Sequence, residues 1–212
     1  GDQPLSHGVL RGDASTWDNS RWPRGVEGGI LPYFGAGQSK CAWYVRAQKR
    51  VRDVFAALWQ TSAKLLVSFD GLIMWRPGEE YKTEHGWFHI DQNPVHKPEM
   101  CSVQALVNLL PSSTQSGGNV LIRGSHNKFP HHYTSSEDSQ RLYTARLQEL
   151  CDEDWLEIDP RDTKMLTPAE IISCMLQPGD MLLWDSRVVH CSCPGSPRGG
   201  THTREGTCLV DA

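Results

Sequence analysis

The chain has 212 residues, of which 38% are hydrophobic, and a formal net charge of −4. This length is enough for one large domain with its own core, which we expect over residues 1–212. The charge excludes a general attraction to nucleic acid or anionic lipid. No apolar run approaches the about 20 residues that a membrane-spanning helix needs, so we expect no membrane span.

The start of the chain, GDQPLSHGVL, lacks the charged, apolar and small-residue regions of a signal peptide. Because the first residue is Gly1 rather than methionine, we expect a processed chain or a fragment. The seven cysteines are odd in number and scattered, unlike the disulfide framework of a small secreted domain. We therefore expect reduced thiols and a cytoplasmic protein, and no feature of the sequence indicates an oligomeric state.

The N-terminal part of the chain combines an irregular segment with a helix. Residues 1–40 are rich in Gly, Pro and Trp, which predicts an irregular lead-in that lies over a core. Apolar residues then recur at positions i, i+3, i+4 and i+7, which predicts an amphipathic helix within residues 41–62. The residues of this pattern are Val51, Val54, Phe55 and Leu58.

Residues 63–212 change to the two-residue period of strands. Strands with adjoining turns are predicted in the segments KLLVSFDGLIMW, SVQALVNLL, SGGNVLIRGSH and QPGDMLLWDSRVVH. A helical insertion is predicted over residues 135–151, because serines suited to an N-cap precede a stripe of Tyr143, Leu147 and Leu150. This order predicts a mainly β two-sheet barrel or jelly roll with helices packed outside it.

The segment GWFHIDQNP places His89 and Asp91 two residues apart. On a strand, residues i and i+2 project to the same face, so the imidazole and the carboxylate converge while Phe88 and Ile90 point the other way. Such a pair suits two adjacent positions on a divalent metal, and a facial site needs a third protein ligand.

Among the nine histidines, His190 is the best candidate for that third ligand. It ends MLLWDSRVVH, a predicted strand whose apolar residues indicate burial. The spacing alone leaves open a hydrogen-bonded core histidine, because HxD also occurs on strands by chance. Weaker candidates in irregular, loop or polar stretches are His7, His131, His132 and His202.

Four motifs in this order, GWFHIDQNP, VQALVNLLP, SGGNVLIRGSH and QPGDMLLWDSRVVHCSCP, resemble the phytanoyl-CoA dioxygenase family of Fe(II)- and 2-oxoglutarate-dependent oxygenases. The resemblance covers residues 65–195. It implies a double-stranded β-helix (a cupin-like jelly roll) with flanking α-helices. It also implies a small-molecule substrate and a metal site for Fe(II), 2-oxoglutarate and O₂ formed by His89, Asp91 and His190.

The resemblance also implies a reaction. Three protein ligands leave two positions for 2-oxoglutarate and one for O₂. An unactivated carbon of a small or lipid-like molecule would be hydroxylated, with release of succinate and CO₂. The carboxylate of Asp91 favours hydroxylation over halogenation, since related halogenases have a small residue at this position. Two alternatives stay open: a cupin-like metalloprotein without 2-oxoglutarate turnover, and a catalytically silent jelly-roll module from a truncated gene.

Contacts to the cofactors are predicted for five further residues, which are Gln92, Gln104, Asn108, Ser192 and Arg204. The three amides follow the Asp ligand or lie on the polar face of the next strand, where an ordinary half-exposed face is the alternative. The resemblance implies that the serine and an arginine contact the distal carboxylate of 2-oxoglutarate. Arg204 heads the apolar run TCLV and suits this role better than Arg198, which stands between Pro197 and Gly199.

Several other residues receive structural interpretations. Cys191 and Cys193 are expected to be free thiols, because a structural zinc site needs four ligands and no second cysteine pair is near in sequence. His126 in IRGSH is expected to be structural. Three tryptophans are expected in the core or the pocket wall: Trp75, Trp87 and Trp184.

Overall fold

The structure is a computed structural model that describes residues 9–10, 12–18, 20–23, 29–61, 64–68, 70–74 and 86–194. The chain divides into two compact units, residues 1–83 and 84–212. The expected single domain over residues 1–212 stays a prediction. Five residues for which a role was considered above lie outside the described ranges: His7, Trp75, Arg198, His202 and Arg204.

The first unit contains short elements. They are η1 (Ala14–Thr16), β1 (Ile30–Leu31), η2 (Ala36–Gln38), α1 (Lys40–Ala47), α2 (Lys49–Leu58) and β2 (Leu72–Ile73). β1 and β2 pair antiparallel. Among the described residues before α1, regular structure is limited to η1, β1 and η2.

The single helix predicted over residues 41–62 is wrong, because two helices occupy this stretch. The backbone of Gln48 has φ −59° and ψ 132°, an extended conformation that ends α1 before α2 begins. Ser39 caps α1 by accepting a hydrogen bond from the backbone N–H of Ala42 at 3.1 Å. The predicted apolar stripe lies on α2, which has no fully buried residue.

The long strand predicted in KLLVSFDGLIMW is also wrong, since Leu72–Ile73 are the only residues paired among those described in this segment. A strand needs a partner that supplies its backbone hydrogen bonds, and β1 offers only two residues. Leu66, expected within the strand, has a fully exposed side chain. Gly71 approaches the backbone of Leu31 so closely that any Cβ at this position would overlap its carbonyl.

The second unit contains two antiparallel sheets. Its strands are β3 (His89–Asp91), β4 (Val103–Val107), β5 (Gly117–Ile122), β6 (Trp155–Glu157), β7 (Ile171–Cys174), β8 (Met181–Asp185) and β9 (His190–Pro194). Five strands form a sheet in the order β6-β3-β9-β5-β7, and β4 pairs with β8 in the second sheet. The chain crosses between the sheets before and after β4 and again before and after β8. This is the expected mainly β double-stranded β-helix.

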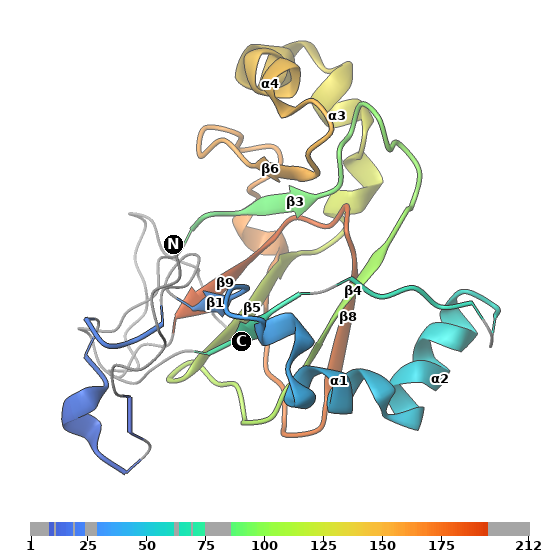
Figure 1. Cartoon of the computed structure of the whole chain (residues 1–212). Helices are drawn as coiled ribbons and strands as arrows, with labels where there is room; N and C mark the ends of the chain where they lie inside the picture. The colour runs from blue at the N-terminus through green and yellow to red at the C-terminus, as the bar shows by residue number, and fades with distance from the viewer. Residues whose placement is uncertain are drawn as a thin grey trace. The chain divides into compact units, whose positions relative to one another are not determined.

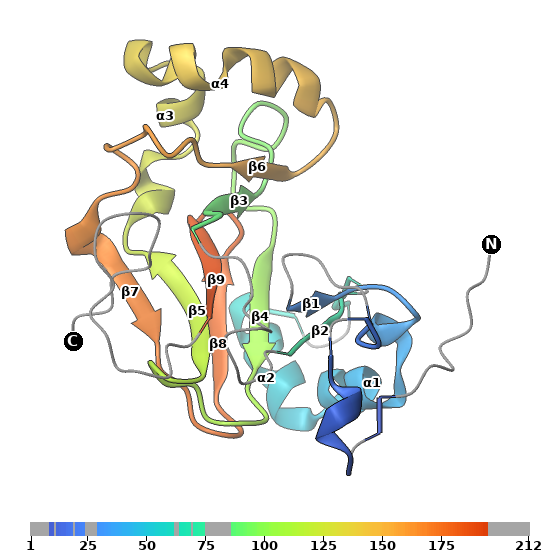
Figure 2. The ribbon, with the colours of Figure 1, turned by 90° about the vertical axis from the view of Figure 1, so that its left-hand side faces the viewer.

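Helices lie outside the sheets of this unit. They are η4 (Ser125–Lys128), α3 (His131–Thr134), α4 (Glu137–Leu150) and η5 (Pro168–Glu170). α4, β6 and β3 follow one another in space, and β7, β5 and β9 lie side by side (Figures 1 and 2). α4 lies within the segment 135–151 for which a helical insertion is predicted, and Ser136 is its N-cap residue. No helix in the described part of the chain is long and apolar enough to cross a bilayer.

The sequence predicted one strand through MLLWDSRVVH with His190 at its end. This prediction is wrong, because MLLWD and His190 belong to different strands. β8 ends at Asp185, whose carboxylate accepts two hydrogen bonds from the guanidinium of Arg187, at 2.9 and 2.6 Å. The backbone N–H of Val188 also donates to the Asp185 carbonyl. This turn reverses the chain, so His190 is the first residue of β9 in the five-stranded sheet.

Alternation along the five-stranded sheet separates an apolar face from a polar one. One face packs under α3 and α4 in a core that includes Ile90, Val120, Ile122, Tyr133, Tyr143, Leu150, Leu156 and Cys191. On the other face, His89 stands directly opposite His190, and Asn119 stands opposite Ser192. The helix side therefore stabilises the sheet and the opposite side carries its polar chemistry.

A buried polar network joins α3 and α4 to the loop after β6. Asp162 accepts hydrogen bonds from the His132 ring at 2.6 Å, the Tyr143 hydroxyl at 2.8 Å and the backbone N–H of Met165 at 3.0 Å. Burial raises the pKa of Asp162, but the hydrogen bonds outweigh it and hold the pKa below its ordinary value. His132 was expected in a loop, and it instead forms part of α3 with a structural contact.

We predict that Asp162→Asn lowers the free energy of unfolding by about 2 to 4 kcal/mol, because two buried hydrogen bonds lose their charged acceptor. Chemical unfolding at pH 7 measures this loss. Because the pKa of Asp162 is lowered in the folded state, the stabilisation is fully present at pH values above the unfolded-state pKa of about 4. It is lost as the pH falls through the folded-state pKa.

Arg123→Ala is the control for this prediction. It breaks an ion pair with Glu170 whose side chains are 66% and 40% exposed, so we expect a loss below about 1 kcal/mol. Equal losses for the two variants, or a loss for Asp162→Asn that does not shrink in acid, would contradict the assignment.

Candidate metal centre

β3 and β9 bring His89, Asp91 and His190 together. Nε2 of His190 lies 3.2 Å and Nε2 of His89 lies 3.5 Å from Oδ2 of Asp91, and one ligand atom from each residue lies within 4.8 Å of the others. Two ligands at right angles on an ion with bonds of about 2.1 Å are about 3 Å apart. The two separations therefore suit neighbouring positions on one metal ion.

Backbone carbonyls fix the orientation of both imidazoles. Nδ1 of His89 lies 3.1 Å from the carbonyl oxygen of Trp87, and Nδ1 of His190 lies 2.9 Å from that of Val188. A carbonyl only accepts, so each Nδ1 carries the ring proton and each Nε2 keeps its lone pair. Both lone pairs are thus available on the side of Asp91, as metal binding requires.

Burial and neighbouring groups shift the pKa values of Asp91 and His190. Burial raises the pKa of Asp91, but the adjacent His190 and His89 outweigh it and the pKa lies far below its ordinary value. Burial lowers the pKa of His190, which the nearby carboxylate of Asp91 only partly offsets. A neutral imidazole beside an ionised carboxylate is the form that binds a divalent metal.

Gln104 orients the carboxylate from the facing sheet. Its Nε2 donates a hydrogen bond to Oδ2 of Asp91 at 2.7 Å, although the two residues lie on β4 and β3. Its Oε1 is buried and has no hydrogen-bond partner among the described residues. The sequence predicted a cofactor contact here, and the structure brings Gln104 to the carboxylate of the cluster.

Gln92 has a different set of partners from those expected for a cosubstrate contact. Its amide donates to the carbonyls of Lys97 and Glu99 at 2.5 and 2.6 Å, and its Oε1 accepts from the Cys101 N–H and the Ser186 hydroxyl at 3.2 and 2.8 Å. The predicted contact of Gln92 with the cosubstrate is therefore wrong. Both N–H donors and the oxygen of its amide are already hydrogen-bonded within the protein, so no group is left for a ligand. Gln92 instead secures two loops beside the cluster.

Asn108 and Ser192, also expected near the cofactors, have contrasting surroundings. The amide of Asn108 donates to the Leu110 carbonyl and the Ser112 hydroxyl, both at 3.2 Å, so it serves the loop after β4. Ser192 is buried on β9, two residues after His190 and on the same face of the sheet. Ser192 therefore lies on the same face of the sheet as His190, whereas Asn108 contacts the loop after β4.

Three indole rings surround the histidines. Trp87 stacks on His89 with ring centroids 4.8 Å apart, Trp155 lies 5.8 Å from the same ring, and Trp184 lies 5.2 Å from the His190 ring. Trp87 and Trp184 therefore form walls of the site. The sequence had left open whether they lie in the core or in the pocket wall. Sequence reasoning missed Trp155, because its position opposite Asp91 depends on the pairing of β6 with β3.

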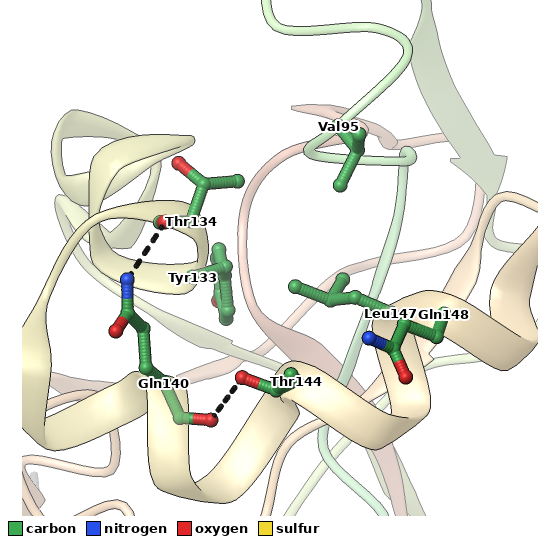
Figure 3. A pocket seen from close by; sticks show the side chains of 7 residues that line it. All are labelled: Val95, Tyr133, Thr134, Gln140, Thr144, Leu147 and Gln148. Atoms are coloured by element: carbon green, nitrogen blue, oxygen red, sulfur yellow. Dashed lines mark hydrogen bonds between the residues drawn. The ribbon is translucent and has the colours of Figure 1, made fainter.

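The hollow shown in Figure 3 lies elsewhere in this unit. It has a volume of about 380 Å³ and is lined by Val95, Tyr133, Thr134, Gln140, Thr144, Leu147 and Gln148. Two polar groups in it are engaged with the local backbone, since Gln140 donates to the Thr134 carbonyl and Thr144 to the Gln140 carbonyl. No residue of the metal cluster lines this hollow.

Comparison with known proteins assigns the family. The family model described as phytanoyl-CoA dioxygenase (PhyH) matches residues 44–199, which include the three clustered ligands. The chain belongs to this family. The match confirms the resemblance to the phytanoyl-CoA dioxygenase family that its motifs carry.

Two relatives illustrate the extent of the similarity. Ava biosynthesis cluster protein O of Aspergillus versicolor is 34% identical over 186 residues, which are 85% of this chain and 58% of that protein. The crystal structure of EctD from S. alaskensis with 2-oxoglutarate and 5-hydroxyectoine gives a TM-score of 0.45 at 20% identity, covering 76% of this chain and 49% of that one. The chain therefore spans about half the length of these two proteins.

We predict that Gln104→Leu raises the Fe(II) dissociation constant about 10- to 100-fold, because it removes the hydrogen bond that orients Asp91. Anaerobic competition with a chromophoric chelator measures the constant. Gln115→Leu makes the same chemical change at an exposed turn and should leave it unchanged. Equal affinity of the wild type and Gln104→Leu would show that the contact with Asp91 has no role in metal binding.

Proposed function

We propose that the protein is an Fe(II)- and 2-oxoglutarate-dependent dioxygenase that hydroxylates an unactivated carbon of a small or lipid-like molecule. The observation that carries this proposal is the convergence of two imidazole Nε2 atoms and one carboxylate oxygen on one side of β3 and β9. Membership of the phytanoyl-CoA dioxygenase family supports the same chemistry. This donor set suits non-haem iron, and it contains none of the thiolates that dominate structural zinc sites.

His89, Asp91 and His190 would hold the iron on one face and leave the other face for ligands. When bound, the iron supplies oxidation of a C–H bond by O₂, coupled to conversion of 2-oxoglutarate into succinate and CO₂. Gln104 keeps the carboxylate of Asp91 in place during this chemistry, and Trp87 restrains the ring of His89 by stacking. These residues act by holding the ligand geometry rather than by transferring protons.

The surroundings of the cluster favour an apolar substrate surface. Trp87, Trp155 and Trp184 place three indole rings beside the histidine ligands. Trp155 remains 39% exposed, and the guanidinium of Arg146 lies 5.4 Å from its ring centroid. Aromatic walls exclude water and pack against hydrocarbon, so we propose that the substrate approaches along Trp155.

The compartment is part of the proposal. Free thiols are found at Cys41, Cys101, Cys151 and Cys174. Free thiols persist in reducing surroundings, which supports a cytoplasmic protein. A disulfide between any of these residues in protein isolated from its native source would contradict this assignment.

We predict that single Ala substitutions of His89, Asp91 and His190 weaken Fe(II) binding strongly and abolish succinate formation, because a facial site has no spare protein ligand. His126→Ala is the control and should leave iron binding largely intact. Anaerobic metal titration and succinate assays measure both properties. Near-normal turnover in any of the three ligand variants would remove that residue from the metal site.

We also predict a hydroxylated rather than a chlorinated product in excess chloride. Asp91 would hold the metal through its carboxylate, which would leave no room there for the halide that a chlorinating site needs. Mass spectrometry of the product formed under ¹⁸O₂ distinguishes the two outcomes. Incorporation of chlorine by the unmodified protein would overturn the assigned reaction class.

A further inference from the structure

Two residues of β6 lie beside the metal cluster on the same face of the sheet. The register pairs Trp155 with Asp91 and Glu157 with His89. Directly opposed residues of antiparallel strands point to the same face, so both side chains stand next to the clustered ligands. Neighbouring strands are about 4.8 Å apart, which is the sideways displacement of these two residues from β3.

A cationic side chain already contacts both of these residues. Arg146 belongs to α4, which lies on the side of β6 away from β3 (Figures 1 and 2). Its guanidinium carbon lies over the Trp155 ring, 5.4 Å from the centroid, and its Nη2 lies 3.6 Å from Oε2 of Glu157. A guanidinium within about 6 Å of an indole face is attracted by the ring, and a carboxylate adds ionic attraction. The ring and the carboxylate together therefore suit a cation.

Arg146 is held loosely in this position. Its separation of 3.6 Å from Glu157 exceeds the about 3.2 Å of a normal N–H···O hydrogen bond, and the two side chains are 43% and 42% exposed. Ion pairs this open to solvent contribute little, because water screens the charges and two long side chains lose freedom. Another cation can therefore replace the guanidinium at a small cost.

The charges around β6 favour a cation over an anion. The segment DEDWLEID, residues 152–159, contains five carboxylates and no basic residue. Asp154 and Asp159 have basic partners at 2.6 Å, whereas the one basic partner of Glu157 among the described residues lies at 3.6 Å. An anionic substrate would meet poorly compensated negative charge here, and a cationic substrate would be attracted.

We propose that Trp155 and Glu157 select a substrate that carries a cationic nitrogen group beside an apolar body. This inference rests on the proposed function. The cation replaces the guanidinium of Arg146 at the ring and the carboxylate. The apolar body then extends over the ring of His89 toward the metal, since that ring lies 5.8 Å from the ring of Trp155. Arg146 competes with the substrate for the same two side chains.

Three probes with the same hexyl chain test the selection of charge: hexylguanidinium, 1-hexanol and hexanesulfonate. Calorimetry gives their dissociation constants on the intact chain loaded with Fe(II) and 2-oxoglutarate without O₂, and again on the metal-free chain. Hexylguanidinium should bind about tenfold or more tightly than the other two probes, because both the ring and the carboxylate favour a cation. It should also change the absorption of the keto-acid chelate, since it binds beside the metal.

Substitutions of the two charged residues should act in opposite directions. Glu157→Gln keeps the size of the side chain and removes its charge, so it should raise the constant for hexylguanidinium about tenfold and leave that for 1-hexanol unchanged. Arg146→Gln removes the competing cation and should lower the constant for hexylguanidinium. Glu170→Gln and Arg123→Gln make the same changes in an exposed ion pair away from the metal cluster, and they should alter neither constant.

The outcomes separate this inference from the proposed function. Equal affinity for the three probes, or tighter binding of hexanesulfonate, would overturn the selection of a cation. Weaker binding of hexylguanidinium by both Glu157→Gln and Arg146→Gln would also overturn it, because the two residues would then support the site only as a pair. If the wild type fails to bind Fe(II) and 2-oxoglutarate while the metal-free chain still prefers hexylguanidinium, the proposed function falls and the cation site stands.

Discussion

The register between β3 and β9 is the constraint on which the candidate metal centre depends. His89 stands directly opposite His190, and Asp91 follows on the same face. If the pairing slipped by one residue, the polar side chains of the slipped strand would point into the apolar core. Ile90 and Cys191, which are fully buried in that core, would be turned out of it. The apolar core under α3 and α4 therefore fixes the register and, through it, the meeting of the three ligands.

Contacts from outside the five-stranded sheet then orient the ligands. Gln104 reaches Asp91 from the facing sheet, and the carbonyls of Trp87 and Val188 set the tautomers of the two imidazoles. Gln92 secures the neighbouring loops through four hydrogen bonds. These contacts restrain the three ligand side chains, which lowers the ordering cost of binding a metal.

Local patterns predicted the parts of this site that depend on neighbours in sequence. The two-residue period places His89 and Asp91 on one face, and the helical stripe of α4 is likewise local. Contacts that depend on long-range pairing were not accessible, such as Gln104 with Asp91 and Trp155 beside His89. For the same reason, alternation in KLLVSFDGLIMW predicted a strand, although within the described part of the chain only the two residues of β1 pair with it.

The most direct test of the account is an anaerobic titration of the intact chain with Fe(II) and 2-oxoglutarate. The account predicts a metal-to-ligand charge-transfer band that saturates at one equivalent of each. The band should be lost when Asp91 is replaced by alanine, because it reports the keto acid chelated on an iron held by all three residues. Absence of the band from the wild type, or a normal band in Asp91→Ala, would contradict the proposed centre.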